Sequence, residues 1–160
     1  MKLSTQEEYG LRCLLQLARA GEGASLTITE MSEKEGISTP NVAKIMRILR
    51  RAGLVKSTRG KTGGYRLTRP AAEVRALDVL SALGGRLFDD TSFCDRHAGV
   101  ERHCLNTRDC SIRPVLRGLQ QAVDQVLGEL TLASLLPSEG EVAVTIRPKA
   151  VKLPIARRAS

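Results

Sequence analysis

Tryptophan is absent from this chain of 160 residues, and tyrosine and phenylalanine occur only twice each. Proteins that bind single-stranded nucleic acid stack the bases on aromatic side chains. So small a set of aromatic residues argues against that class of protein. The core must instead be built mainly from leucine, valine, isoleucine and alanine.

An apolar run of roughly 20 residues, the length needed to cross a bilayer, is also missing. Glu7 and Glu8 stand where a secretory signal would carry basic residues, so no such signal is expected. We therefore expect a cytoplasmic protein. In a reducing compartment its four cysteines are expected to be thiols or metal ligands rather than disulfides. Cys13, within an apolar helical pattern, is expected to be a buried packing residue.

Acidic residues are missing from residues 36–72, which contain nine of the 25 Lys and Arg residues. The rest of the chain is nearly balanced, with 16 basic and 17 acidic residues, so this stretch accounts for the net charge of +8. A concentration of positive charge on a patterned segment is typical of a surface that binds a polyanion. The alternative is a solvated basic face without a partner.

Two capping boxes open the predicted helices of the first 36 residues. Ser4 with Glu7 predicts a helix of about four turns, and Thr27 with Glu30 predicts a short helix that stops at Gly36. A third helix is predicted after Ser38 or Thr39, with Pro40 in its first turn and its end at Gly53. Its inner face is apolar (Val42, Ile45, Met46, Leu49) and its outer face is basic (Lys44, Arg47, Arg51).

Two short strand-like runs, residues 54–59 and 65–68, flank the glycine-rich residues 60–64 and predict a β-hairpin. Together these elements predict a mainly α fold with a winged helix-turn-helix domain, which points to double-stranded DNA. The start of the third helix would enter the major groove, and the hairpin tip the minor groove. The predicted DNA-binding residues are Ser38, Thr39, Pro40, Asn41, Lys44, Arg47, Arg51, Arg59 and Lys61.

Three cysteines, Cys94, Cys104 and Cys110, lie in a segment without clean periodicity between a predicted helix over 74–83 and the next helix. A long irregular loop needs a reason, and function is a common one. Nine residues separate the first two cysteines and five the last two, which is not the paired spacing of structural zinc sites. Spacing alone leaves an iron–sulfur cluster, zinc and a thiol switch open.

A long helix is predicted from Pro114 onward. Its apolar residues recur in steps of three and four, the pattern of helix-on-helix packing between subunits. The alternative is one face packed on its own domain. We expect a homodimer, because two-fold symmetric DNA sites need two readers. The predicted seam comprises Leu116, Leu119, Val123, Val126 and Leu130.

The predicted organisation has four parts. Residues 1–85 form a winged helix-turn-helix DNA-binding domain, and residues 86–113 form a cysteine-containing, cluster-binding loop. Residues 114–136 form a C-terminal dimerisation helix region. Residues 137–160, which become basic without acidic residues toward the end, are expected to be a flexible tail with weak attraction to DNA.

Several segments together resemble the IscR/NsrR/RirA-type family of bacterial iron–sulfur winged-helix regulators, over about residues 1–136. The resemblance implies a homodimeric transcription factor that binds promoter DNA and whose [2Fe-2S] or [4Fe-4S] cluster senses iron, redox state or nitric oxide. It also implies Cys94, Cys104 and Cys110 as ligands. The segments are Met1-Lys2-Leu3-Ser4, Ile37-Ser38, the wing over residues 59–65, the three-cysteine loop and Thr131-Leu132-Ala133-Ser134-Leu135.

The chain departs from this family at the cluster and at the reading helix. Arg113 stands where some members place a histidine ligand, and the first gap between cysteines is longer than is usual. Glu8 matches an acidic position that some members contribute from the partner subunit, with His97 and His103 as alternatives. Ala43 replaces an acidic base-reading residue of IscR-like proteins, which implies a different operator.

Two alternatives remain open, one within the same function class and one in a different class. A regulator of the same fold could use its loop cysteines as a thiol switch or zinc site, and an iron–sulfur electron carrier or cluster-transfer protein would need no basic helix. An enzyme is not expected, because no nucleotide-binding loop, paired-histidine metal motif or acid–base constellation is present outside the loop.

Overall fold

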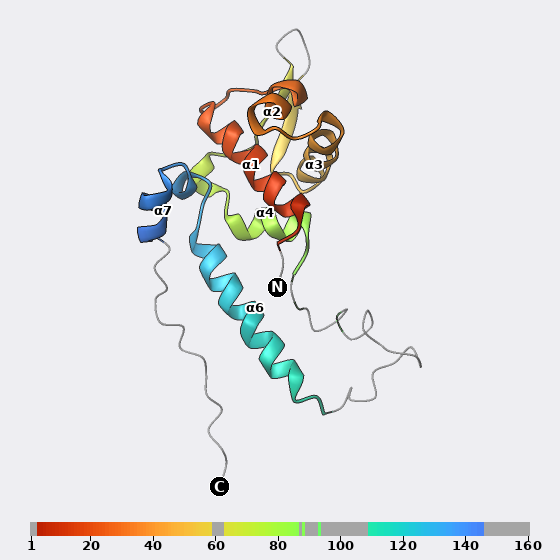
Figure 1. The fold of residues 1–160 in the computed structure, drawn as a ribbon, viewed down its shortest axis with the longest axis vertical. Helices are drawn as coiled ribbons and strands as arrows, with labels where there is room; N and C mark the ends of the chain where they lie inside the picture. Colours follow the sequence, from red (N-terminus) through yellow and green to blue (C-terminus); the bar gives the residue numbers. More distant parts are fainter. Residues whose placement is uncertain (1–2, 59–62, 87, 89–92, 94–108, 146–160) are drawn as a thin grey trace.

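The computed structural model describes residues 3–58, 63–86, 88, 93 and 109–145 (Figure 1). This part of the chain is mainly helical and has one two-stranded antiparallel sheet. The elements, in chain order, are α1 (Thr5–Arg19), α2 (Ile28–Glu35), α3 (Thr39–Arg51), β1 (Val55–Thr58), β2 (Gly64–Leu67), the 3-10 turn η1 (Ala71–Glu73), α4 (Ala76–Leu83), α6 (Ile112–Glu129), the 3-10 turn η2 (Ala133–Leu135) and α7 (Glu139–Thr145).

Figure 1 shows two parts of unequal size. Helices α1 to α4 and the hairpin form a body, and α6 leaves this body as a separate rod. Among the described residues, no helix is long and apolar enough to cross a membrane.

Helices α1 and α2 begin at the two predicted capping boxes. The Glu7 amide donates to Ser4 Oγ at 3.3 Å, and the Ser4 amide donates to the Glu7 carboxylate at 2.7 Å. At α2 the corresponding distances between Thr27 and Glu30 are 3.1 and 2.7 Å. The hydrogen bond from the Thr27 amide holds the pKa of Glu30 below its usual value. Gly36, at φ 64°, ends α2 in the left-handed conformation that its lack of a Cβ permits.

We expect Thr27→Ala to lower the free energy of unfolding by about 1 kcal/mol, because the side-chain acceptor of the α2 cap is lost. Thr29→Ala is the matched control, since Thr29 is exposed, lies within α2 and makes no capping bond. Urea unfolding followed by circular dichroism measures both. Equal stability of the two variants would show that the capping box contributes nothing.

The core of the body is built around α3. Its predicted inner residues, Val42, Ile45, Met46 and Leu49, are all buried. They pack with buried residues of α1 and α2, among them Leu14, Leu17 and Met31. Burial of these side chains is the main force that fixes the orientation of α3, and it leaves the opposite face of the helix in solvent.

The hairpin follows α3 directly. The strands pair as a hairpin, as the sequence predicts, with Val55 opposite Leu67 and Thr58 opposite Gly64. Gly64 thus belongs to β2 rather than to the tip. Leu26 extends the sheet by one residue, because its amide and carbonyl exchange hydrogen bonds of 2.9 and 2.8 Å with Tyr65. A Cβ at position 64 would lie 2.5 Å from the Leu26 carbonyl oxygen, so this close approach requires glycine.

Helix α4 begins two residues later than the sequence predicts. Val74 is extended and accepts a hydrogen bond from the Leu132 amide at 2.9 Å, while the Ala76 amide donates to the Leu130 carbonyl at 2.9 Å. This pairing with residues far along the chain overrides the local helical preference. It ties the end of α6 to the body.

Helix α6 begins at Ile112 rather than Pro114. Proline is tolerated in a first turn, because the amide that it lacks has no acceptor there.

Residues 139–145, within the segment 137–160 that the sequence predicts as a flexible tail, form the helix α7, which the sequence analysis does not predict. The amide and hydroxyl of Ser138 donate to the Glu141 carboxylate at 2.9 and 2.6 Å, and these bonds lower the pKa of Glu141. Ser138 and Glu141 are thus a third helix-starting pair that the sequence contained. Residues 146–160 lie outside the described residues.

Candidate nucleic-acid interface and cysteine loop

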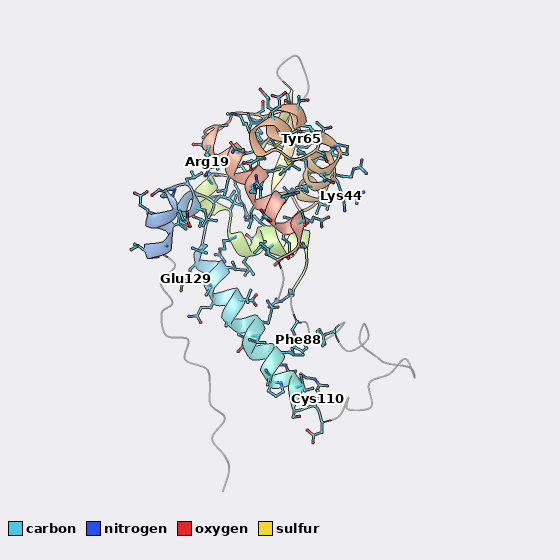
Figure 2. The ribbon with its side chains drawn as sticks, in the orientation of Figure 1. Arg19, Lys44, Tyr65, Phe88, Cys110 and Glu129 are labelled. Atoms are coloured by element: carbon cyan, nitrogen blue, oxygen red, sulfur yellow. The ribbon has the colours of Figure 1, made fainter. Side chains whose placement is uncertain are left out.

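The outer face of α3 carries the predicted DNA-binding side chains into solvent. Every one of these residues that the structure describes is exposed (Ser38, Thr39, Pro40, Asn41, Lys44, Arg47, Arg51). Figure 2 shows Lys44 pointing away from the body at α3, with Arg19 on the other side of the body. The alternation of buried apolar and exposed polar positions along α3 therefore places the cations and the start of the helix on one accessible surface.

The start of α3 differs from the starts of α1 and α2. Ser38 is its N-cap residue and makes no side-chain capping hydrogen bond. The amides of the first turn lack an acceptor within the helix, and they carry the positive end of the helix dipole. A phosphate group is a suitable acceptor at such a position.

The positive charge of α3 is not neutralised by neighbouring carboxylates. The ion pairs found in the described part of the chain involve Arg12, Arg69 and Arg86, and none involves Lys44, Arg47, Arg50 or Arg51. Since residues 36–72 contain no acidic side chain, no local partner exists in the sequence either. The face therefore keeps its full charge for an external polyanion.

A polar network that the sequence did not reveal joins α1 to the end of α2. Arg12 donates to the Glu35 carboxylate from Nε at 2.6 Å and to the Glu35 carbonyl at 2.8 Å, and Gln16 donates to the same carboxylate at 2.5 Å. The hydrogen bond to Glu35 raises the pKa of Arg12. Because α2 leads directly into the turn before α3, this network helps to fix the helix-turn-helix angle. No local pattern connects positions 12 and 35, so only the fold brings them together.

The wing tip, with Arg59 and Lys61, lies outside the described residues. The strands that carry it are described, and Thr58 Oγ1 donates to the Gly64 carbonyl at 3.3 Å beneath the tip.

The chain that leaves α4 toward the cysteine loop runs along α6. Arg86 pairs with Asp124, and the Phe88 amide donates to Gln120 Oε1 at 2.9 Å. Phe88 is buried, and its ring lies 5.0 Å from that of Phe93, the residue before Cys94. These contacts anchor the beginning of the loop on α6. Cys94, Cys104, His97 and His103 lie outside the described residues.

The two described cysteines have different surroundings. Cys110 is a half-buried free thiol just before α6 (Figure 2). Cys13 is fully buried in α1, as predicted, and burial raises the pKa of its thiol to about 11. Within the described residues, no three His, Cys, Asp or Glu side chains lie close enough to hold a metal ion. Any cluster site must therefore include the residues around Cys94 and Cys104, or a second subunit.

We expect iodoacetamide at pH 8 to alkylate Cys13 about a hundredfold more slowly in the native protein than in guanidinium. The thiolate is the reactive form, and burial suppresses it. Peptide mass spectrometry separates Cys13 from Cys110, which serves as the accessible comparison. Labelling of Cys13 at its denatured rate in the native protein would contradict its burial.

Glu8 is exposed on the first turn of α1, where it pairs with Arg12 at 3.5 Å. The same turn lies against the end of α4, because the Gln6 side chain donates to the Leu83 carbonyl at 2.5 Å. Cys110 is at the far end of α6 (Figure 2). Within one chain the structure does not bring Glu8 and Cys110 together.

Helix α6 has one side against other parts of its own chain and another side in solvent, and the exposed apolar residues differ from the predicted seam. Leu130 is buried, and Leu116 and Val123 are half-buried against their own chain. An apolar stripe remains exposed and retains Leu119 and Val126 from that seam. The stripe comprises Ile112, Val115, Leu119 and Val126, with exposed fractions of 63%, 60%, 51% and 39%.

Comparison with known sequences identifies relatives over most of the chain. The sequence profile of the Rrf2 family, described as "Iron-dependent Transcriptional regulator", matches residues 3–138. A curated relative named "Protein rrf2", from Nitratidesulfovibrio vulgaris, is 32% identical over 136 residues, which are 85% of this chain and 87% of that protein.

Solved structures of transcriptional regulators are also similar to this chain. IscR of T. potens is similar with a TM-score of 0.66 and 28% identity, covering 85% of this chain and 86% of that one. CymR (YrzC), the global cysteine regulator of B. subtilis, is similar with a TM-score of 0.67 and 27% identity, covering 85% and 96%. These likenesses confirm the predicted winged-helix fold class and the predicted family resemblance.

Proposed function

Because the chain belongs to the Rrf2 family of winged-helix transcriptional regulators, we propose that it binds promoter DNA as a homodimer and that an iron–sulfur cluster controls this binding. The family is one of transcriptional regulators, and we propose no enzymatic activity for this member. Its place of action would be the cytoplasm, where bacterial promoters are. The observation that carries the DNA-binding part is the exposed cationic face of α3, which rests on a buried apolar base and has no ion-pair partner among the described residues.

In this proposal α3 enters the major groove with its first residues against the base edges. Asn41 can pair with adenine through two hydrogen bonds, and Thr39 can contact a thymine methyl. Ser38 and Pro40 would lie beside them at the groove floor. The basic residues one and two turns later would hold phosphates, which position the helix without reading sequence. These phosphate contacts are assigned to Lys44, Arg47, Arg50 and Arg51, with Arg59 and Lys61 of the wing tip at the minor groove.

The exposed stripe of α6 supports a homodimer. Ile112, Val115, Leu119 and Val126 follow one another by three, four and seven residues, so they form a single row. A second copy offers the same row, and a two-fold axis would pack the rows against each other. Residues 114–136 would thus act as the dimerisation region, extended at its start to Ile112. Two reading helices would then face two half-sites of one operator.

The cysteine loop, residues 86–113, is the proposed cluster site. Three thiolates are the donor set that iron–sulfur clusters use, and Cys110, the described member, is a free, half-buried thiol. The chemistry of these side chains therefore suits the group. Cys94, Cys104 and Cys110 would hold it, with Glu8 of a partner subunit as the fourth ligand and His97 or His103 as alternatives. A bound cluster supplies sensitivity to iron supply, redox state or nitric oxide.

Control of DNA binding would arise from the position of the loop between the body and α6. The start of the loop is fixed to α6 by Phe88, Gln120 and Asp124, and its end is the first turn of α6 itself. Binding of a cluster by the loop residues would therefore bias how α6 sets the two bodies apart. Without a cluster, only a small fraction of dimers would hold the two bodies at the spacing that suits DNA. The apparent DNA affinity would then be reduced by that fraction.

Anaerobic purification followed by visible absorption and native mass spectrometry tests the cluster. We expect a coloured dimer whose mass includes iron and sulfide. The variants Cys94→Ala, Cys104→Ala and Cys110→Ala should each lose the colour, whereas Cys13→Ala, the matched control, should keep it. Glu8→Ala should change the spectrum, and Glu33→Ala on the surface of α2 should not. A colourless wild-type protein would contradict the cluster.

One specific observation favours a second candidate. CymR of B. subtilis, which is named a global cysteine regulator, is as similar to this chain as IscR. CymR of Staphylococcus aureus, which is also similar, has been solved in an oxidised form. The loop cysteines would then act as a thiol switch or bind zinc, on the same DNA-binding fold. A colourless protein that contains stoichiometric zinc, or that loses DNA affinity on oxidation by hydrogen peroxide, would favour this alternative.

A further inference from the structure

A cavity of about 290 Å³ lies on the body, between the end of α1, the turn after it and the strands of the hairpin. Leu17, Leu67 and Pro70 give it an apolar lining. Its charged lining residues are Lys56, Arg66, Arg69 and Glu22. The cavity is separate from the exposed face of α3 and from the cysteine loop, since no residue assigned to either lines it.

Two of the cations that line this cavity lie at paired positions of the hairpin. Lys56 of β1 is directly opposite Arg66 of β2 in the strand register. Like charges at opposite positions destabilise a sheet. Neither side chain has an ion-pair partner within the described part of the chain, whereas Arg69 is partly compensated by Asp78 at 3.1 Å. Glu22 is the one acidic side chain among the lining residues.

Arg66 shows a second sign of incomplete pairing. Its Nε is buried and has no hydrogen-bond partner, and it is the one such side-chain atom among the described residues. A buried donor without a partner is costly, and more so when it belongs to a charged group. Rotation of the guanidinium toward an acceptor in the cavity would give this donor a partner.

We propose that the cavity binds a small organic anion, a carboxylate or a phosphate ester with an apolar body. Lys56 and Arg66 would hold the anionic group, and Leu17, Leu67 and Pro70 would contact the apolar part. The volume is at the lower limit of the range typical of small-molecule sites, which is about 300 Å³. An anion bound between the Lys56 and Arg66 side chains would remove their like-charge repulsion, which a neutral ligand of the same shape would not do.

The position of the cavity gives such a ligand a route to DNA binding. The ligand would connect the turn after α1 to both strands that carry the wing tip. If the ligand has different affinities for the free and the DNA-bound protein, it changes the affinity of the protein for DNA. By linkage, DNA then changes the affinity for the ligand by the same factor. This coupling rests on the proposed DNA-binding function, whereas the binding of the anion does not.

Titration of the DNA-free protein tests the site. The probes are hexyl phosphate and hexanoate, with inorganic phosphate and hexanol as controls that each lack one half of the ligand. We expect hexyl phosphate to shift the amide NMR signals of residues 21–24, 66–69 and 71 in a saturable way. Each control should bind at least tenfold more weakly. Equal binding of hexanol, or no saturable shift with either anion, would overturn the proposal.

Three variants with the same loss of charge complete the test. Lys56→Gln and Arg66→Gln should each weaken hexyl phosphate binding at least tenfold, whereas Arg19→Gln, exposed and outside the lining, should not change it. Without ligand, Arg66→Gln should leave Tm unchanged or raise it by a few degrees Celsius, because repulsion is relieved. A purely structural role predicts a lower Tm. If hexyl phosphate fails to bind while both variants lose DNA affinity, the cations hold a DNA phosphate and the small-anion site is refuted.

Discussion

Replacing both Lys44 and Arg47 with glutamine is expected to lower the affinity for operator DNA on the order of a thousandfold at 0.1 M salt. A dimer would lose four cations. Each phosphate contact releases counterions and contributes close to a factor of ten relative to 1 M salt. The slope of log affinity against log salt should become shallower by about three to four.

The structure predicts that this loss is confined to DNA binding. Both side chains are exposed and have no ion pair within the described residues, while the buried side of α3 is untouched. Circular dichroism and thermal unfolding should therefore match the wild-type protein. Arg19→Gln with Arg75→Gln is the control, because these exposed residues lie off α3 and their loss changes the net charge equally. A comparable loss in that control would mean that net charge, rather than the α3 face, determines affinity.

Replacing Leu119 and Val126 with glutamate is expected to convert the dimer to a monomer and to weaken operator binding at least a hundredfold. Both residues belong to the exposed row of α6, with 51% and 39% of their surface accessible in one chain. In a dimer the substitutions would bury four like charges along one seam, which is strongly unfavourable. Binding of two linked readers also depends on their high effective concentration, which a monomer lacks.

Sedimentation velocity measures the change of assembly, and fluorescence anisotropy with a labelled operator measures the change of affinity. The matched control is Gln121→Glu with Gln125→Glu, which adds the same charge at exposed positions of α6 outside the row. That control should remain dimeric. A dimer that persists in the Leu119 and Val126 variant would show that α6 is not the interface.

The body was largely predictable because its signals are local. Capping pairs at Ser4 and Thr27 and the apolar spacing of α3 specify helix starts and buried faces within a few residues. The hairpin follows from glycines between two short strands. Contacts distant in sequence were not visible in this way: Val74 is extended because residue 132 pairs with it, and Arg12 meets Glu35 only in the folded chain.

The candidate sites were likewise predictable where the signal is local and not where it depends on contacts distant in sequence. Exposure of the α3 cations followed directly from helical periodicity. The exposed apolar row of α6 could not be predicted, because residue spacing does not show which apolar residues are buried against their own chain, as Leu130 is. The repulsion of Lys56 and Arg66 depends on strand register and was not predicted. The helix over residues 139–145 was missed although Ser138 and Glu141 have capping-box spacing.

The DNA-binding role of α3 is tested most directly by the salt dependence of operator affinity for the wild-type dimer. With about eight to ten phosphate contacts, the affinity should fall at least a thousandfold between 50 and 200 mM salt. Anisotropy titrations at four salt concentrations measure the slope. An affinity that changes less than about threefold over that range, equivalent to one contact or fewer, would contradict binding through the cationic face.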